Sequence, residues 1–256
     1  MSDQPPFCVR TAFHSWGDLA ATVRSFPLLS ALAALAGAVT SLSNVDLAAF
    51  EDPTAAAVVR TLGGTVIEAL FTTPLLLAAH RLVILADTAS TLGDTVTRLR
   101  FWRFFLLSAG LLALLYVPLL LTRWSEETDT IAATALLVGM IVSAATGLLL
   151  SLLFPAIAID APGASIRNAV ADLWGKVWSI FCSGLLAVLP IAVAASVMGM
   201  IQKAFVEDRE GLPARLTAAP FEGALTAATY VLLVFVASRY FLARASRLKR
   251  PDPAAT

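Results

Sequence analysis

The chain alternates between long apolar runs and short polar breaks. A helix needs about 20 apolar residues to cross a bilayer core, and six stretches meet that requirement: Phe26–Leu42, Thr61–Ala79 with an extension to Ala86 left open, Phe104–Leu121, Ile131–Ile159, Trp178–Ile201 and Phe221–Ala243. This pattern predicts an all-α, polytopic integral membrane protein with six transmembrane helices. Residues 26–243 form the membrane domain, between an N-terminal interfacial segment (1–25) and a basic C-terminal tail (244–256).

One apolar segment occurs twice, 73 positions apart. TPLLLAAHRLVILAD (73–87) and TGLLLSLLFPAIAID (146–160) agree at six of fifteen positions, and each precedes a second long apolar run. The repeating unit is therefore a hairpin of two membrane helices. A third copy is predicted in the last helix, where Ser238-Arg239 align with His80-Arg81 at an offset of 158. The hairpins would pair the second helix with the third, the fourth with the fifth, and the sixth with the first.

Three semi-polar stretches precede the first, third and fifth predicted helices. They read SWGDLAATVRSF, TLGDTVTRLRFW and SIRNAVADLWGKVW, with apolar positions at helical spacing. Such stretches suit short amphipathic helices that lie in the membrane interface, with tryptophan at headgroup level.

Composition and charge agree with this interpretation. The chain is 58% hydrophobic and 14% charged, with a mean hydropathy of +0.81, whereas soluble domains carry about 25% charged residues. Zero net charge gives no reason to expect a nucleic acid partner. Thirteen Lys and Arg residues fall on one side of the predicted membrane and five on the other, which places both termini in the cytoplasm. The five are Arg60, Arg123, Lys203, Arg209 and Arg215.

Two features of the apolar helices indicate how they pack. Small residues recur every four positions in the fourth helix, and such a face lets another helix approach closely: Ala135, Gly139, Ser143, Gly147 and Ser151. An internal packing seam is favoured over a homodimer interface, which stays an alternative. Prolines that can kink a helix occur at Pro74, Pro118, Pro155 and Pro190.

Glu68 is the most conspicuous candidate for a function inside the membrane. It lies in GGTVIEALFTTP, where a carboxylate must be neutral, paired or hydrated. Thr226, its equivalent in the last helix, is the best candidate for a hydrogen bond to it. Glu68 could carry a proton, or it could mark the outer end of a helix that is shifted inward.

A basic group at the inner side forms the second candidate site. His80 and Arg81, together with Arg98, Arg100 and Arg103, could bind the phosphate of a lipid headgroup at the inner leaflet. The competing interpretation, which is favoured, is that these charges only anchor the topology.

At these residues the chain resembles a known group of proteins. AAHRLVILAD, then RLRFWRFFLLSAGLL, then SLLFPAIAIDAPGASIRNAVADLWGKVWSIF resemble uncharacterised bacterial six-helix membrane proteins, which are similar to the membrane domain attached to some glycerophosphodiester phosphodiesterases. The resemblance implies a bacterial inner-membrane location and a fold of repeated hairpins, and it supplies no activity. An arginine expected just before SLLFPAIAID is replaced here by Leu149-Leu150.

The sequence favours a protein without enzymatic activity. His80-Arg81 is followed by Leu82 and not by the glycine of the phosphodiesterase motif, and no catalytic serine, phosphate-loop or HExxH motif occurs. No cofactor or metal is predicted. The preferred function is that of an accessory or structural protein that organises lipids or other membrane proteins. The alternative is a small transporter or channel, proton-coupled through Glu68.

Overall fold

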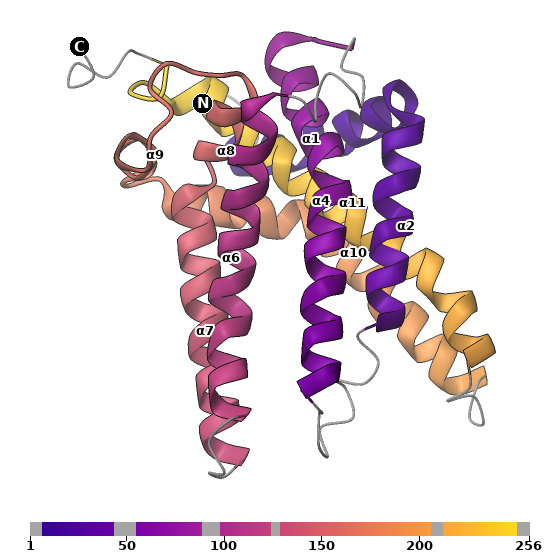
Figure 1. Ribbon diagram of the computed structural model, residues 1–256. Helices are drawn as coiled ribbons and strands as arrows, with labels where there is room; N and C mark the ends of the chain where they lie inside the picture. Colours follow the sequence, from indigo (N-terminus) through magenta and orange to yellow (C-terminus); the bar gives the residue numbers. More distant parts are fainter. Residues whose placement is uncertain (1–6, 44–54, 89–97, 124–128, 206–211, 250–256) are drawn as a thin grey trace.

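In the computed structural model, every long described segment is helical. The structure describes residues 7–43, 55–88, 98–123, 129–205 and 212–249. The helices shown in Figure 1 are α1 (Phe7–Ser25), α2 (Pro27–Ser43), α4 (Ala55–Leu85), α6 (Leu99–Arg123), α7 (Asp129–Leu150), α8 (Leu153–Ala158), α9 (Ile166–Leu173), α10 (Val177–Phe205) and α11 (Leu212–Arg244).

The protein is all-helical, and several of its helices are suited to cross a membrane. Within the described residues, three apolar stretches are long enough: Leu62–Leu85 in α4, Val177–Met200 in α10 and Ala218–Arg244 in α11. A fourth span is present if α1 and α2 count as one bent helix pair. The apolar part of α7, Leu137–Leu150, is shorter. The sequence predicted six such helices where the structure establishes three or four.

A sharp elbow separates α1 from α2. The two helices meet at 104°, and α1 contains the first of the predicted amphipathic stretches. Pro27 explains the bend because it has no N–H for the carbonyl of Val23 and disfavours a helical conformation in the residue before it. Pro27 then becomes the first residue of α2, a position where proline fits a helix well.

The predicted helix Ile131–Ile159 is broken in the structure. α7 ends at Leu150 and α8 begins at Leu153, so the prediction of one continuous helix was wrong. Pro155 accounts for the break, because it cannot donate a hydrogen bond to the carbonyl of Ser151. α8 turns away from α7 and packs against α4, α6 and α11. Pro74 and Pro190, by contrast, lie inside unbroken helices.

α2 and α11 pack against each other more extensively than any other pair of described helices. α2 and α11 cross at Gly37 and Gly223, where a Cβ atom added to Gly37 would lie 3.0 Å from the Cα of Gly223. Backbones can approach this closely only where side chains are absent. α4 packs against both helices, so α2, α4 and α11 form the tightest part of the bundle.

The small-residue face of α7 packs inside the same chain. The Ser143 hydroxyl donates to the carbonyl of Leu111 in α6 at 3.0 Å, and Gly147 faces the Leu111 side chain. Gly139 is buried, and the side chain of Ala135 lies outside the described residues. The contacts made by Ser143 and Gly147 agree with the internal seam that the sequence favoured.

Candidate functional site

Glu68 is sealed between two helices. It lies on α4 with 6% of its surface exposed, and the Thr40 hydroxyl of α2 hydrogen-bonds its carboxyl group. The same hydroxyl lies 3.1 Å from the carbonyl oxygen of Gly64. The Oε1 atom of Glu68 has no hydrogen-bond partner among the described residues. The hydroxyl that reaches Glu68 thus comes from α2, whereas the sequence suggested Thr226 on α11, which is half-buried.

His80 is buried between helices near the C-terminal end of α4, out of reach of a lipid headgroup. Its side chain is fully buried, its Nδ1 atom lies 2.7 Å from the Ser238 hydroxyl, and its ring packs edge-on against Phe104. Ser238 is the residue that the sequence alignment matched to His80. Leu153, the aligned residue of the remaining copy, is buried on α8, which packs against both α4 and α11. The aligned positions of the copies therefore lie on helices that converge at one end of the bundle.

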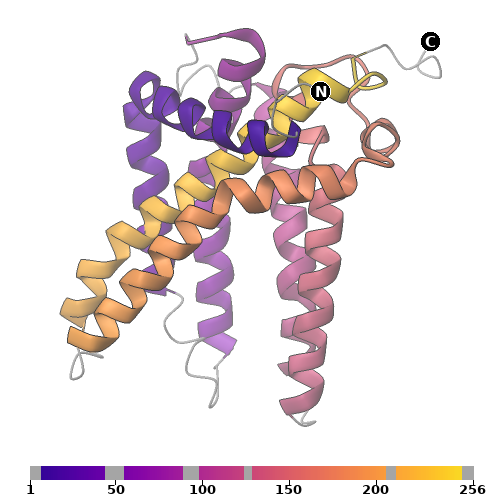
Figure 2. The same cartoon turned by 180° about the vertical axis from the view of Figure 1, so that it is seen from behind.

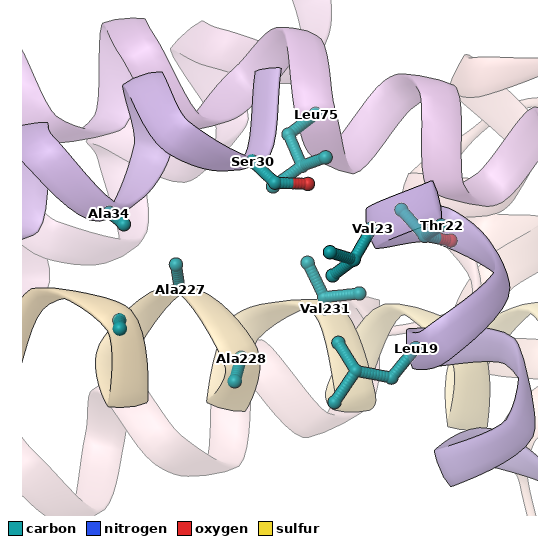
Figure 3. A pocket seen from close by; sticks show the side chains of 10 residues that line it. Leu19, Thr22, Val23, Ser30, Ala34, Leu75, Ala227, Ala228 and Val231 are labelled. Atoms are coloured by element: carbon teal, nitrogen blue, oxygen red, sulfur yellow. The ribbon is translucent and has the colours of Figure 1, made fainter. Parts of the chain in front are cut away.

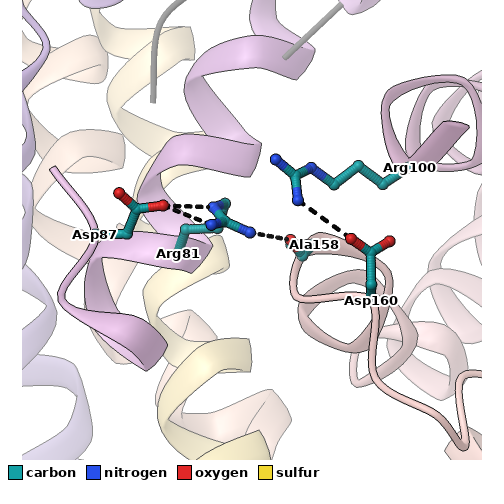
Figure 4. Close-up of polar contacts among 5 residues, drawn as sticks. All are labelled: Arg81, Asp87, Arg100, Ala158 and Asp160. Atoms are coloured by element: carbon teal, nitrogen blue, oxygen red, sulfur yellow. Dashed lines mark hydrogen bonds and ion pairs between the residues drawn. The ribbon is translucent and has the colours of Figure 1, made fainter. Parts of the chain in front are cut away.

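Two of the predicted headgroup-binding arginines pair with aspartates of the same chain. Arg81 forms an ion pair with Asp87 at 2.6 Å and reaches the carbonyl of Ala158 at 3.5 Å. Arg100, which is buried, pairs with Asp160 at 3.1 Å. Figure 4 shows that both arginines point toward the end of α8, so they fasten helix ends together.

The remaining predicted headgroup contacts are exposed at the same end. Arg98 and Arg103 lie on the surface near the start of α6. Sequence reasoning missed the acidic partners of the arginines, although the repeat contained a signal: aspartate closes both copies, at Asp87 and Asp160.

Asp172 holds the chain segment that follows α11. This α9 carboxylate accepts hydrogen bonds from the backbone N–H groups of Ser246, Arg247 and Leu248 and from the Ser246 hydroxyl, at 2.9–3.1 Å. Burial raises the pKa of Asp172, but these hydrogen bonds outweigh it and hold the pKa below its usual value. Sequence reasoning did not single out Asp172, although it stands in the third amphipathic stretch.

A third ion pair joins the two ends of the chain. Asp18 on α1 binds the guanidinium of Arg239 on α11 through two hydrogen bonds, at 2.8 and 2.9 Å. Such a bidentate pair fixes the orientation of both side chains. It positions α1 across the C-terminal end of α11.

Two cavities lie on either side of this ion pair. The first, of about 160 Å³, is lined by residues of α1, α2 and α11 and by Leu75 of α4 (Figure 3). The second, of about 340 Å³, lies between the start of α1 and the end of α11, and Arg10, His14 and Arg239 contribute to its lining. Glu68 lines neither cavity.

In comparisons with known proteins, no family model, no curated protein and no solved structure matches this chain. The described residues form an all-helical fold with three or four helices that could cross a membrane, and several of its buried polar side chains hydrogen-bond to backbone groups.

Proposed function

We propose that the chain is a six-helix protein of the bacterial inner membrane, with both termini in the cytoplasm, that organises lipid of the inner leaflet without catalysing a reaction. Its resemblance to uncharacterised bacterial six-helix membrane proteins and its distribution of Lys and Arg support this location. α2, α4, α6, α7, α10 and α11 alternate in direction (Figure 1), which agrees with six crossings if α6 and α7 also span the membrane.

The elbow between α1 and α2 is the observation that carries the proposal. A helix that turns through 104° before the first long apolar helix can lie flat at the membrane surface while α2 enters the membrane. α1 is fastened there by Asp18 and Arg239, and α1 and α11 line a cavity on each side of that pair. A protein that organises lipid needs such a fixed surface helix and few hydrated groups inside the membrane.

Purification should recover the protein together with lipid. We expect the chain, extracted in a mild detergent and isolated by size exclusion, to retain phospholipid in a fixed molar ratio, measured by mass spectrometry of the extracted lipids. Membrane proteins that copurify in a fixed ratio would extend the function to organising other proteins. A monodisperse monomer that carries neither lipid nor protein would contradict the proposal.

Proton-coupled transport through Glu68 is the second candidate. The unpartnered Oε1 atom of Glu68 favours it, whereas the contact with Thr40 and the position of Glu68 outside the lining of both described cavities favour the accessory function. We expect Glu68→Gln to leave proton flux unchanged in proteoliposomes that contain a pH-sensitive dye. Glu222→Gln, at an exposed glutamate of α11, is the matched control. A loss of flux in the Glu68 variant alone would establish the transporter instead.

A further inference from the structure

The beginning of α6 presents large apolar side chains on its outer face. Leu99 and Leu106 are 64% exposed and Trp102 is 46% exposed, and residues three and seven positions apart share one face of a helix. Phe101 and Phe104, on the opposite face, are buried in the bundle. Because contact between apolar side chains and water is unfavourable, the outer face is suited to lipid.

The ring of Trp102 is held in one orientation at the surface. Phe101 packs edge-on against it with ring centroids 5.1 Å apart, and Phe105 does the same at 6.0 Å. An exposed tryptophan combines an apolar ring with an N–H donor, and such residues gather where the hydrocarbon core meets the headgroups. The position of Trp102 therefore marks a level on α6 that fits this boundary.

Two arginines beside this face lack an acidic partner. Arg98 lies directly before α6, Arg103 follows Trp102, and both are exposed. Neither side chain forms an ion pair or a hydrogen bond with any residue that the structure describes. Arg100, by contrast, pairs with Asp160. Since a guanidinium group binds phosphate through two parallel hydrogen bonds, Arg98 and Arg103 can each accept an anion.

The length of α6 places these residues at the membrane surface in the proposed topology. α6 begins at the end of the bundle where α1 and α9 lie (Figure 1), and Figure 2 shows α1 and α9 at that end from behind. Its 25 residues extend for about 37 Å, whereas the hydrocarbon core is about 30 Å thick. A helix of this length that crosses the core has its first turns among the headgroups.

We propose that the beginning of α6 binds an anionic phospholipid of the inner leaflet. Arg98 and Arg103 bind the headgroup, Trp102 lies at the boundary below it, and Leu106 contacts an acyl chain. Charge complementarity selects this occupant, because two unpaired cations favour a lipid with net negative charge over a zwitterionic one. This inference rests on the proposed function and names its ligand and its site.

A second arginine at the same end of the bundle supplies a matched control. Arg247 is exposed, and its neighbours in the chain are Ser246 and the fully buried Leu248. It therefore has the charge of Arg98 and Arg103 without an apolar outer face beside it. Basic residues that only anchor the topology act through their charge, so under that interpretation replacing any of the three would have the same effect.

Replacing the arginines tests the headgroup contact. Wild type, Arg98→Gln, Arg103→Gln, the double variant and Arg247→Gln are equilibrated in detergent with equal amounts of phosphatidylglycerol and phosphatidylethanolamine. Retained lipid is counted by native mass spectrometry, and size exclusion confirms that each variant is folded. We expect each single variant at the site to lower the preference for phosphatidylglycerol about fivefold, the double variant to lower it further, and Arg247→Gln to match wild type.

Tryptophan fluorescence tests where the lipid lies. Phospholipids with brominated acyl chains quench tryptophans that they contact, so brominated phosphatidylglycerol should quench wild type more than brominated phosphatidylethanolamine does. We expect this excess quenching to disappear in Trp102→Phe and in the double arginine variant. Trp178→Phe, which makes the same change at an exposed tryptophan of α10, should retain it.

The results separate the site from the proposed function. If wild type retains lipid but the double variant keeps the wild-type preference, or if Arg247→Gln lowers it equally, the site is wrong while the proposed function stands. If wild type retains no lipid of either kind, both fail. If inorganic phosphate at matched concentration raises the Tm of wild type as much as phosphatidylglycerol does, the site binds a free anion and the phospholipid assignment is overturned.

Discussion

Replacing Gly223 with alanine is expected to be the most damaging single-methyl change in this protein. A Cβ atom at Gly223 would overlap the carbonyl oxygen of Ala34 and the backbone nitrogen of Ala38. Backbone atoms of a helix cannot rotate away as a side chain can, so α2 and α11 would have to separate. Overpacking that side chains can absorb costs about 1–3 kcal/mol, and we expect this variant to lose more than about 3 kcal/mol or to fail to fold.

A matched glycine provides the control. A Cβ atom at Gly110 of α6 would meet nothing within 4 Å, and alanine favours a helix over glycine by about 0.5–1 kcal/mol. We therefore expect Gly110→Ala to match or exceed wild type, and Gly37→Ala to fall between the two, in thermal or denaturant unfolding in detergent. Equal stability of the Gly223 and Gly110 variants would show that the helices do not cross as described.

The second large effect is expected at Asp172. Replacing it with asparagine removes the charge and places N–H groups opposite the N–H groups of Ser246, Arg247 and Leu248. A hydrogen bond to a charged group contributes about 1.5–3 kcal/mol, so the segment after α11 should detach. Hydrogen exchange at residues 246–248 should accelerate by at least about tenfold. Asp87→Asn, which breaks an ion pair elsewhere, should leave exchange at these residues unchanged.

The Asp172 carboxylate is also expected to make the attachment of residues 246–248 depend on pH. The pKa of folded Asp172 lies below its ordinary value of 3.8, so its stabilisation is fully present above that value and is lost as the pH falls through the folded pKa. Protection of residues 246–248 should therefore persist down to about pH 4 and decline in more acidic solution. The Asp172→Asn variant should show no such decline. A decline in wild type near neutral pH would exclude Asp172 as the group responsible.

The helices could be predicted well because hydrophobicity is a local property. The predicted stretch Trp178–Ile201 lies inside α10, and Phe26–Leu42 differs from α2 by one residue at each end. The repeat even matched His80 with Ser238, which proved to be in contact. The break before α8 was underestimated, because a proline predicts a weakened helix but not whether the helix bends or ends.

Polar contacts were harder to predict, because they depend on which helices become neighbours. From the sequence alone, Arg81 and Arg100 could bind either a lipid headgroup or an acidic side chain of the protein. Only the position of α8 in the fold places Asp160 beside Arg100. Thr40 could not be matched to Glu68 by aligning repeats, since α2 and α4 correspond to different predicted hairpins. Asp172 was missed because its partners are backbone N–H groups, which have no signature in the sequence.

The pairing of α2 with α11 has a consequence for how the chain is made. α2 is synthesised before α11, the helix that covers its glycine, and residues 44–211 lie between the two. At about 5–20 residues per second, α2 must wait on the order of ten seconds or more for its main partner. During that interval its bare backbone face is available to other helices, including those of other chains. A chain that stops before α11 never acquires the contact that completes the bundle, so truncation would leave an intermediate suited to recognition by membrane quality control.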